Sequence, residues 1–252
     1  MTITALIPCR AQSSRLPGKN MRVLAGRPLL FWTIDAAKAS GIFEAIIVST
    51  DTREIVDKAQ DQGVSAMISR PPSHVGHCPD IIWVRDALRW KVLRWRRPSD
   101  AFAIVRVTSP FRFGSHIREA WRRFQNHQPC DSLRAMRLVR EHPAKMWKWD
   151  VEHGPYVSPA VEGADGEGRP WHSLPTQLLP TYYVQTAGLE IAWWRTVTEL
   201  GTIAGKRVLP FLLDGPAALD INTDHDWQEA QCIAEQLSDQ RQTHDSGDLV
   251  TT

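Results

Sequence analysis

The chain has 252 residues, and its 30 lysines and arginines stand against 28 aspartates and glutamates, which gives a net charge of +2 at pH 7. A balance this even argues against nucleic acid as a partner, because nucleic-acid-binding proteins concentrate basic side chains on one surface. The four cysteines are too widely spaced for a metal-binding pair or a disulfide framework, and no apolar stretch is long enough to span a membrane, so we expect a cytoplasmic protein with reduced thiols and no membrane partner.

Short apolar segments alternate with amphipathic stretches over the first two-thirds of the chain, a pattern typical of strand–helix–strand units built on a mainly parallel sheet. The stretch 28–40 shows the helix signals most clearly, since Pro28 stands at its first turn and Gly41 follows its last residue. Asp51 lies just before the next expected helix, and we expect it to cap that helix. The predicted elements up to residue 140 are strands at 3–9, 45–49, 65–68, 101–107 and 131–140, and helices at 28–40, 52–62, 79–95 and 115–126. The predicted fold class is therefore α/β, with three layers and a mainly parallel sheet flanked by helices.

The pattern changes between residues 142 and 180, where six prolines and a polar, glycine-rich run at 162–168 exclude a single regular element. Long non-helical insertions in compact domains are usually functional or intermolecular, so we expect an extended insertion of two arms joined by a turn. After it, the chain returns to strands at 183–192 and 206–212 and a helix at 224–240. We predict one domain over residues 1–242, with the insertion at about 142–180 and a disordered polar tail at 243–252.

The loop after the first strand, residues 10–20, combines three cations with two hydroxyl groups: Arg10, Ser13, Ser14, Arg15 and Lys19. An open α/β sheet presents the carboxyl ends of its strands to ligands, and this loop follows such an end. Arginine binds phosphate oxygens bidentately and lysine adds a point charge, so the loop suits a triphosphate. It matches neither the P-loop nor the dinucleotide-binding motif, and a solvated surface turn is the alternative that composition alone leaves open.

A second candidate site lies between the last strand and the last helix, in the sequence Asp-Ile-Asn-Thr-Asp-His-Asp that begins at Asp220. Residues two apart on an extended segment project to the same side, so Asp220 and Asn222 can face one ligand. Magnesium prefers oxygen ligands and needs only one or two carboxylates when substrate phosphates complete its shell. We expect Asp220 to bind Mg²⁺ directly and Asn222 to bind it directly or through water. Thr223 or Asp224 capping the last helix is the competing interpretation, and both can hold together.

Blocks of sequence in the same order resemble the cytidylyltransferases that activate acidic nine-carbon sugars, the CMP-sialic acid synthetase-like family that includes the legionaminate and pseudaminate enzymes. The resemblance covers nearly the whole chain, up to about residue 240. The blocks are residues 7–20, 24–30, 48–51, 69–72, 108–112, 142–147, 177–180 and 218–223.

This resemblance implies that CMP is transferred from CTP to an acidic sugar with release of pyrophosphate, in a reaction that needs Mg²⁺. It implies a set of nucleotide-binding residues around the triphosphate and ribose: Arg10, Ser13, Lys19, Asn20 and Arg70. It also implies catalytic roles for Arg10, Lys19 and Asp220. The family usually has a second aspartate where this chain has Asn222, so one negative charge is lost from the metal site.

The acceptor side departs from the family pattern. Arg106 stands where the family has glutamine, Thr176 where it has arginine, and Thr186 where it has asparagine. Our hypothesis is an unusual acidic sugar or another anionic acceptor, with Arg106 and Lys145 as its positive counterpart. Gln177 and Thr186 complete the expected acceptor-binding residues.

The resemblance further implies that the insertion is a dimerisation arm and that the protein is a homodimer. Trp147, Trp149 and Trp171 would anchor that interface, although packing within one chain explains them nearly as well. A second enzymatic interpretation keeps the fold but uses a sugar 1-phosphate or phosphonate acceptor, with GTP as a possible donor. A third is a non-catalytic nucleotide-binding homologue, for which Asn222 is the only direct hint.

Overall fold

The computed structural model describes all 252 residues except 12, 14, 69–78 and 248–252. The chain forms two compact units, the first made of residues 1–135 and 186–252 and the second of residues 136–185. The chain leaves the first unit within one strand, β7, and returns within another, β10.

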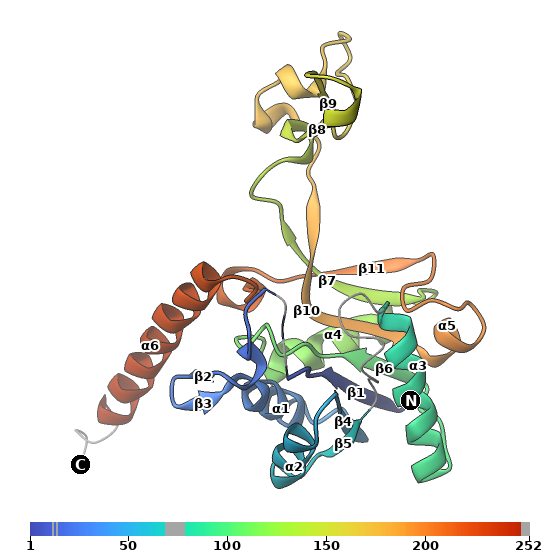
Figure 1. The fold of residues 1–252 in the computed structure, drawn as a ribbon, viewed down its shortest axis with the longest axis vertical. Coiled ribbons are helices and arrows are strands. Elements are labelled where there is room, and N and C mark those ends of the chain that lie inside the picture. The colour runs from blue at the N-terminus through green and yellow to red at the C-terminus, as the bar shows by residue number, and fades with distance from the viewer. Residues whose placement is uncertain (12, 14, 69–78, 248–252) are drawn as a thin grey trace. The chain divides into compact units, whose positions relative to one another are not determined.

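A seven-stranded sheet in the order β11-β7-β10-β6-β1-β4-β5 forms the centre of the first unit (Figure 1). β1 pairs in parallel with β4 and β6, β4 pairs in parallel with β5, and β10 pairs with β6 in the antiparallel sense. The mostly parallel α/β sheet that the alternating pattern predicts is thus confirmed. The strands are β1 (Ile3–Pro8), β4 (Ala45–Thr50), β5 (Ser65–Ile68), β6 (Ala101–Ile104), β7 (Ser132–Leu138), β10 (Tyr183–Trp193) and β11 (Val208–Leu212).

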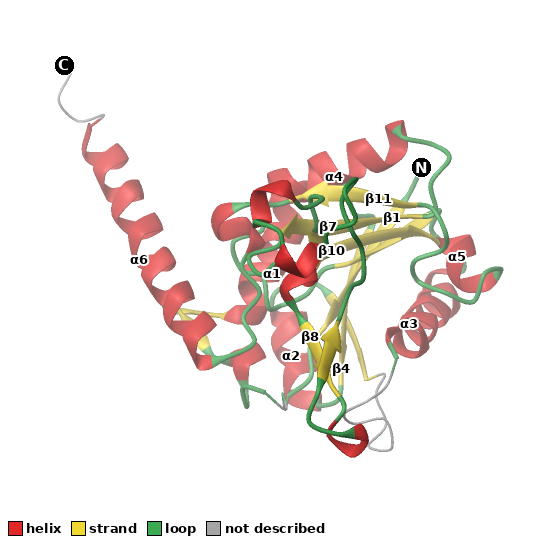
Figure 2. Cartoon of the chain, turned by 90° about the horizontal axis from the view of Figure 1, so that it is seen from above, coloured by secondary structure: helices red, strands yellow, loops and turns green. Residues whose placement is uncertain are grey.

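Helices cover both faces of this sheet (Figure 2), because successive strand residues point to opposite sides. In β6, Ala101 and Ala103 pack with α1, α2, α4 and α6, whereas Phe102 and Ile104 pack with α3 and α5. The first unit therefore has the expected three layers. The helices are α1 (Leu29–Ser40), α2 (Arg53–Asp61), α3 (Asp80–Trp95), α4 (Gly114–Asn126), α5 (Trp194–Thr198) and α6 (Asp224–Gly247).

Helix boundaries follow local signals where these are strong. α1 starts after Pro28 and ends at Gly41, which adopts φ +68°, a conformation that costs glycine little. The closing helix is longer than predicted: α6 continues past Gln240 to Gly247, so residues 243–247 are helical and the predicted disordered tail is wrong there. No glycine or proline occurs between Asp224 and Ser246 to stop the helix earlier.

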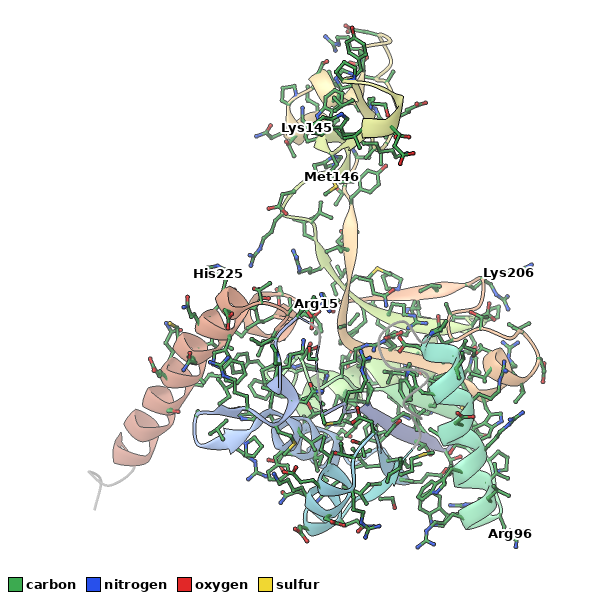
Figure 3. The ribbon with its side chains drawn as sticks, in the orientation of Figure 1. Arg15, Arg96, Lys145, Met146, Lys206 and His225 are labelled. Carbon is green, nitrogen blue, oxygen red and sulfur yellow. The ribbon has the colours of Figure 1, made fainter. Side chains whose placement is uncertain are left out.

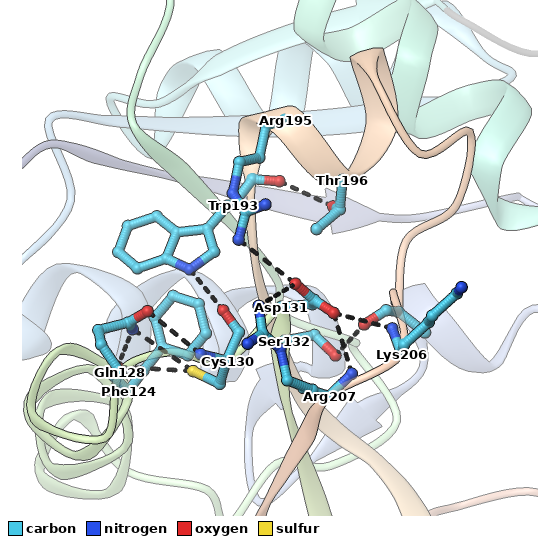
Figure 4. A network of polar contacts seen from close by, with 11 residues as sticks. Phe124, Gln128, Cys130, Asp131, Ser132, Trp193, Arg195, Thr196, Lys206 and Arg207 are labelled. Carbon is cyan, nitrogen blue, oxygen red and sulfur yellow. Dashed lines mark hydrogen bonds and ion pairs between the residues drawn. The ribbon is translucent and has the colours of Figure 1, made fainter.

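A polar network fixes β11 beside the start of β7 (Figure 4). The Asp131 carboxylate accepts hydrogen bonds from the backbone N–H groups of Lys206 and Arg207, both at 2.9 Å, and pairs with the Arg195 guanidinium at 3.3 Å. These backbone donors, with the charge of Arg207, lower the pKa of Asp131. Gly205 approaches so closely, at φ +71°, that a Cβ atom there would lie 2.3 Å from the Asp131 Cβ. Only glycine fits this turn, which delivers the chain into β11 and toward the candidate metal-binding turn.

The second unit consists of short elements, as its prolines predict. Strands β8 (Trp147–Trp149) and β9 (Val157–Pro159) pair in the antiparallel sense. Four single 3-10 turns accompany them: η3 (Pro143–Lys145), η4 (Val151–His153), η5 (Trp171–Ser173) and η6 (Thr176–Leu178). The buried apolar cluster of this unit contains Ala144, Leu174 and Leu179, with Trp171 packed against it. Trp171 therefore serves packing within the chain, one of the two roles considered for it.

Candidate functional site

Two segments about 200 residues apart in sequence meet at the ammonium group of Lys19. Lys19 lies in the short 3-10 turn η1 (Lys19–Met21) that ends the loop after β1, and it is only 5% exposed. Its Nζ donates to the backbone carbonyl of Ile221 at 2.7 Å and to Asn222 Oδ1 at 3.3 Å. The basic loop and the acidic turn proposed from the sequence thus lie against each other.

Two side-chain contacts brace the loop that carries Lys19. Asn20 Nδ2 donates to the carbonyl of Arg10 at 2.8 Å, which ties the two ends of the loop together. The Asp51 carboxylate accepts from the backbone N–H of Ala11 at 2.8 Å. The expectation that Asp51 caps the following helix is wrong, since Thr52 is the residue before α2 and makes no side-chain cap bond. Because β1 and β4 are parallel neighbours, their carboxyl ends lie side by side and Asp51 reaches across.

The cations of the loop are the next feature of the site. In the part of the chain that the structure describes, Arg10, Arg15 (Figure 3) and Lys19 form no salt bridge. Burial is the main reason why the pKa of Lys19 falls from 10.5 to about 8; Arg15 and Arg10 lower it further, and Asp220 opposes them. Positive charge concentrated without a protein counter-ion indicates an anion-binding site.

The turn after β11 holds one carboxylate oxygen unused. Asn222 Nδ2 donates to Asp220 Oδ2 at 2.7 Å, whereas Asp220 Oδ1 is buried and has no hydrogen-bond partner among the described residues. Asp226 accepts from the backbone N–H groups of Asn222 and Thr223, and Thr223 Oγ1 accepts from the Asp226 N–H at 3.2 Å. Thr223, one of the two capping candidates from the sequence, therefore caps α6. Asp220 remains available for another role.

The chemistry of this turn fits a hard divalent cation. A buried carboxylate oxygen without a partner costs free energy unless a ligand, ion or water satisfies it. No group of three His, Cys, Asp or Glu side chains suitable for a metal occurs within the described ranges. A cation at Asp220 would thus depend on substrate oxygens for most of its shell, which is how Mg²⁺ is commonly held in nucleotide-dependent enzymes.

Arg106 is already paired, contrary to the hypothesis that its charge is available to the acceptor. Its guanidinium contacts Glu190 Oε1 at 2.7 Å and Asp80 Oδ2 at 2.5 Å. Glu190 in turn pairs with Arg134, whose pKa is lowered to about 10, chiefly by burial. The two carboxylates and two guanidinium groups balance in charge, so the charge of Arg106 is already neutralised within the protein.

Buried polar groups without partners gather near the end of β6. Thr186 Oγ1 and Ser109 Oγ have no hydrogen-bond partner in the described part of the chain, and both lie beside Gly188. Arg112, which sequence reasoning did not select, is fully buried and uses one nitrogen on the carbonyls of Arg106 and Gly188. Its other two guanidinium nitrogens have no partner within the described stretches, and burial lowers its pKa to about 9. The only available signal for Arg112 was its place in block 108–112.

The remaining predicted site residues are Lys145, Gln177, Arg70 and Ser13. Lys145 (Figure 3) and Gln177 belong to the second unit. Lys145 Nζ donates to the carbonyl of His172 at 2.8 Å and also to that of Leu174. Gln177 is exposed in η6. Arg70 lies outside the described residues. Ser13 is described and half-buried in the loop.

A family model described as "Cytidylyltransferase" matches residues 4–79, the segment that contains β1, the basic loop and Asp51. Over this segment the chain is similar to cytidylyltransferases. CMP-N,N'-diacetyllegionaminic acid synthase from Legionella pneumophila is 42% identical over 120 residues, which cover 48% of this chain and 52% of that protein. N-acylneuraminate cytidylyltransferase A from Danio rerio is 28% identical over 233 residues, which cover 91% of this chain and 50% of that protein. The chain thus spans about half the length of these cytidylyltransferase relatives.

The fold agrees with this relationship. A solved structure of CMP:2-keto-3-deoxy-manno-octonic acid synthetase in complex with CTP superposes with a TM-score of 0.66 at 12% identity, covering 94% of this chain and 99% of that one. At this identity the likeness establishes the fold alone. Among the described residues, no helix combines the length and the apolar character needed to cross a lipid bilayer.

Proposed function

We propose that the protein transfers CMP from CTP to an acidic sugar and releases pyrophosphate, with Mg²⁺ as the cofactor. The observation that carries this proposal is the pair of hydrogen bonds from Lys19 to Ile221 and Asn222, which puts the unpaired cations of the loop beside the unused oxygen of Asp220. An anion site next to a single-carboxylate cation site is what a metal–nucleoside triphosphate requires.

The loop residues would bind and orient the nucleotide. Arg10 and Lys19 supply charge to the phosphates, and Ser13 supplies a hydroxyl group. Asn20 shapes the loop through its bond to the Arg10 carbonyl and keeps its own Oδ1 for the ribose. When bound at Asp220, Mg²⁺ supplies positive charge to the phosphate oxygens and lowers the pKa of the attacking hydroxyl group.

The reaction needs no protein nucleophile. The acceptor oxygen forms a bond to the α-phosphorus while the bond to the pyrophosphate oxygen breaks, and the hydroxyl proton is lost to water. Positioning and charge stabilisation do most of the catalytic work in such transfers. Cys9 and Cys130 are buried, which suits packing, and burial raises the pKa of the Cys130 thiol, which disfavours a reactive thiolate.

The acceptor class follows from the polar groups near the end of β6. Thr186 and Ser109 offer hydroxyl groups for a polyhydroxylated molecule, and Arg106 can accept an anion by exchange with Asp80. Lys145 and Gln177 remain proposed acceptor-binding residues on the second unit, and Arg70 remains a proposed nucleotide-binding residue. A cytoplasmic location remains a prediction from the spacing of the cysteines.

We further propose a homodimer formed through the second unit. Only three apolar residues are buried in its cluster, whereas ten large apolar side chains between residues 136 and 185 are exposed, including Trp149 at 64% and Tyr156 at 87%. A unit this small cannot be stable on so little buried area, and exposed apolar clusters of this size mark association surfaces. Light scattering should show a dimer that Leu178→Glu weakens, while Leu93→Glu, an equally exposed leucine of the first unit, leaves it intact. A monomeric wild-type protein would refute the proposal.

Pyrophosphate release tests the proposed reaction directly. The protein is incubated with each of CTP, GTP, UTP and ATP, together with acidic sugars, sugar 1-phosphates and phosphonates. We expect release with CTP and an acidic sugar, lost in Asp220→Asn and kept in Asp214→Asn, which removes an exposed carboxylate six residues away. Release only with GTP or only with a phosphorylated acceptor would support the second interpretation. Nucleotide binding without release in any pairing would identify a non-catalytic homologue.

A further inference from the structure

Asn222 lies between two groups of opposite charge. Its Oδ1 accepts from Lys19 Nζ at 3.3 Å, and its Nδ2 donates to Asp220 Oδ2 at 2.7 Å and to the Asp220 carbonyl at 3.3 Å. Lys19 and Asp220 form no salt bridge with each other, so the amide of Asn222 is what links the ammonium to the carboxylate.

The charges on either side determine which way this amide points. An asparagine side chain has an acceptor end and a donor end. Turning it over would place the NH₂ group against the Lys19 ammonium and the oxygen against the Asp220 carboxylate, and both contacts would be repulsive. The Oδ1 atom is therefore committed to Lys19 and faces away from Asp220.

We propose that Asn222 is a positioning residue and not a metal ligand: it holds Lys19 with its oxygen and Asp220 Oδ2 with its NH₂ group, so that Asp220 Oδ1 alone binds the cation. This inference rests on the proposed function. It replaces the expectation from the sequence that Asn222 ligates Mg²⁺ directly or through water. The buried Oδ1 atom without a partner is the oxygen that the arrangement leaves for the metal.

The identity of residue 222 therefore sets how the metal is held. A carboxylate has two equivalent acceptor oxygens, so an aspartate at 222 could bind Lys19 with one and a cation with the other. The amide cannot do both. With a single protein oxygen, the cation binds weakly to the protein alone, and the phosphates of the nucleotide supply most of its ligands. Metal and nucleotide then enter the site together.

Manganese binding to the protein without nucleotide or acceptor tests the ligand assignment, since the EPR signal of free Mn²⁺ reports occupancy without turnover. We expect Asn222→Asp to tighten Mn²⁺ binding by about tenfold and Asp220→Asn to weaken it by about tenfold, in the range seen when ligand charge changes. Asn222→Ala should change it by less than about threefold, because no ligand is removed. The controls are Asp214→Asn and Asn126→Ala, both exposed, and thermal melts verify that each variant folds.

Calorimetric titration of CTP without metal tests the second part of the proposal, that Asn222 holds Lys19 in position. Asn222→Ala removes one of the two hydrogen bonds that hold Lys19, so CTP affinity should fall by about threefold or more, whereas Asn126→Ala should not change it. The proposal is overturned if Asn222→Ala weakens Mn²⁺ as strongly as Asp220→Asn, if Asn222→Asp fails to tighten it, or if metal-free CTP affinity is unchanged. Neither measurement involves CMP transfer, so a protein that binds as expected and transfers nothing would refute the proposed function and leave this inference standing.

Discussion

The two ends of the central sheet differ in whether their buried charges have counter-ions among the described residues. At the end where β4 and β6 begin, the Glu44 carboxylate pairs with Lys91 at 2.7 Å and Arg97 at 2.8 Å, and also accepts from Ser99. At the end where β1 and β6 finish, neither the Lys19 ammonium nor Asp220 Oδ1 has an ionic partner among the described residues, and Asp220 Oδ1 has no hydrogen-bond partner there either. Of the nine buried side-chain atoms without a partner in the described residues, seven lie at this second end, on Thr52, Thr108, Ser109, Arg112, Thr186 and Asp220.

The difference separates polar groups that hold the fold from polar groups that await a ligand. A buried charge is tolerated when its own protein supplies the counter-ion, and its loss then destabilises the fold. A buried polar group without a partner lowers stability, and it persists where binding of a ligand compensates. Substitutions where β4 and β6 begin should therefore lower mainly stability, and substitutions where β1 and β6 finish should lower mainly activity.

The largest effect is expected at the end of the sheet where β1 and β6 finish, which we call the ligand end. Asp220→Asn and Lys19→Met should each lower kcat/KM by about 10²- to 10³-fold, because each removes charge that faces the reacting phosphates. Melting temperatures should not fall, since neither group stabilises the fold through an ion pair. Steady-state kinetics and thermal melts together check this; a marked loss of stability would place these groups with the structural charges.

Lys91→Met should have the next largest effect, on stability rather than activity. It leaves the half-buried Glu44 carboxylate without its most buried partner, and the unfolding free energy should fall by about 3 kcal/mol. Arg97→Met is the matched control: Arg97 binds the same carboxylate but is 66% exposed, so its loss should cost less than about 1 kcal/mol. Urea unfolding measures both, and equal costs would contradict the assignment.

Arg112→Met repeats the same type of substitution at the ligand end. Arg112 is as buried as Lys91 but pairs with no carboxylate of the described residues, so an apolar side chain of similar length should change the unfolding free energy by no more than about 1 kcal/mol. The KM for the acceptor should rise, because Arg112 holds the backbone of Arg106 against that of Gly188. A stability loss as large as that of Lys91→Met would show that the carbonyl contacts stabilise the fold.

The last prediction is that stability rises with pH at both ends for opposite reasons, because the fold favours the charged form of Glu44 and disfavours the charged form of Lys19. Burial alone would raise the pKa of Glu44, but the hydrogen bonds from Lys91 and Ser99 outweigh it and lower that pKa from 4.5. Its stabilisation is therefore present above pH 4.5 and is lost as the pH falls through the folded-state pKa. The Lys19 pKa is lowered to about 8, so the folded state disfavours the charged form, and that cost disappears as the pH rises from 8 to 10.5.

Urea unfolding at several pH values measures both dependences. Relative to Lys19→Met, wild-type stability should rise between pH 8 and 10.5, by at most about 1.4 kcal/mol per pH unit. Glu44→Gln should remove part of the acid sensitivity. A wild-type protein whose stability relative to Lys19→Met falls over the alkaline range would show that Lys19 is stabilised by an ion pair.

The sequence gives good predictions where neighbours in the chain control the structure. The helix at 28–40, the strand at 65–68 and the cap at Thr223 depend on propensity and local hydrogen bonds, and all three are present. The ligand-facing position of the basic loop also follows, because a loop after a strand of a parallel sheet opens at its carboxyl end. The short helix α5 was missed, since five residues carry too little periodicity to be recognised.

By itself, the sequence determined the alternation of strands and helices, the chemistry of the loop and the acidity of the last turn, all of which are properties of adjacent residues. Only the tertiary structure decided which of these charges are neutralised. Arg106 is paired, Asp51 braces the loop, and the Asn222 amide is oriented by Lys19 and Asp220. The reason is that electrostatic pairing depends on distance in space, and the partners of each of these residues, apart from the Asp220 neighbour of Asn222, come from distant parts of the chain.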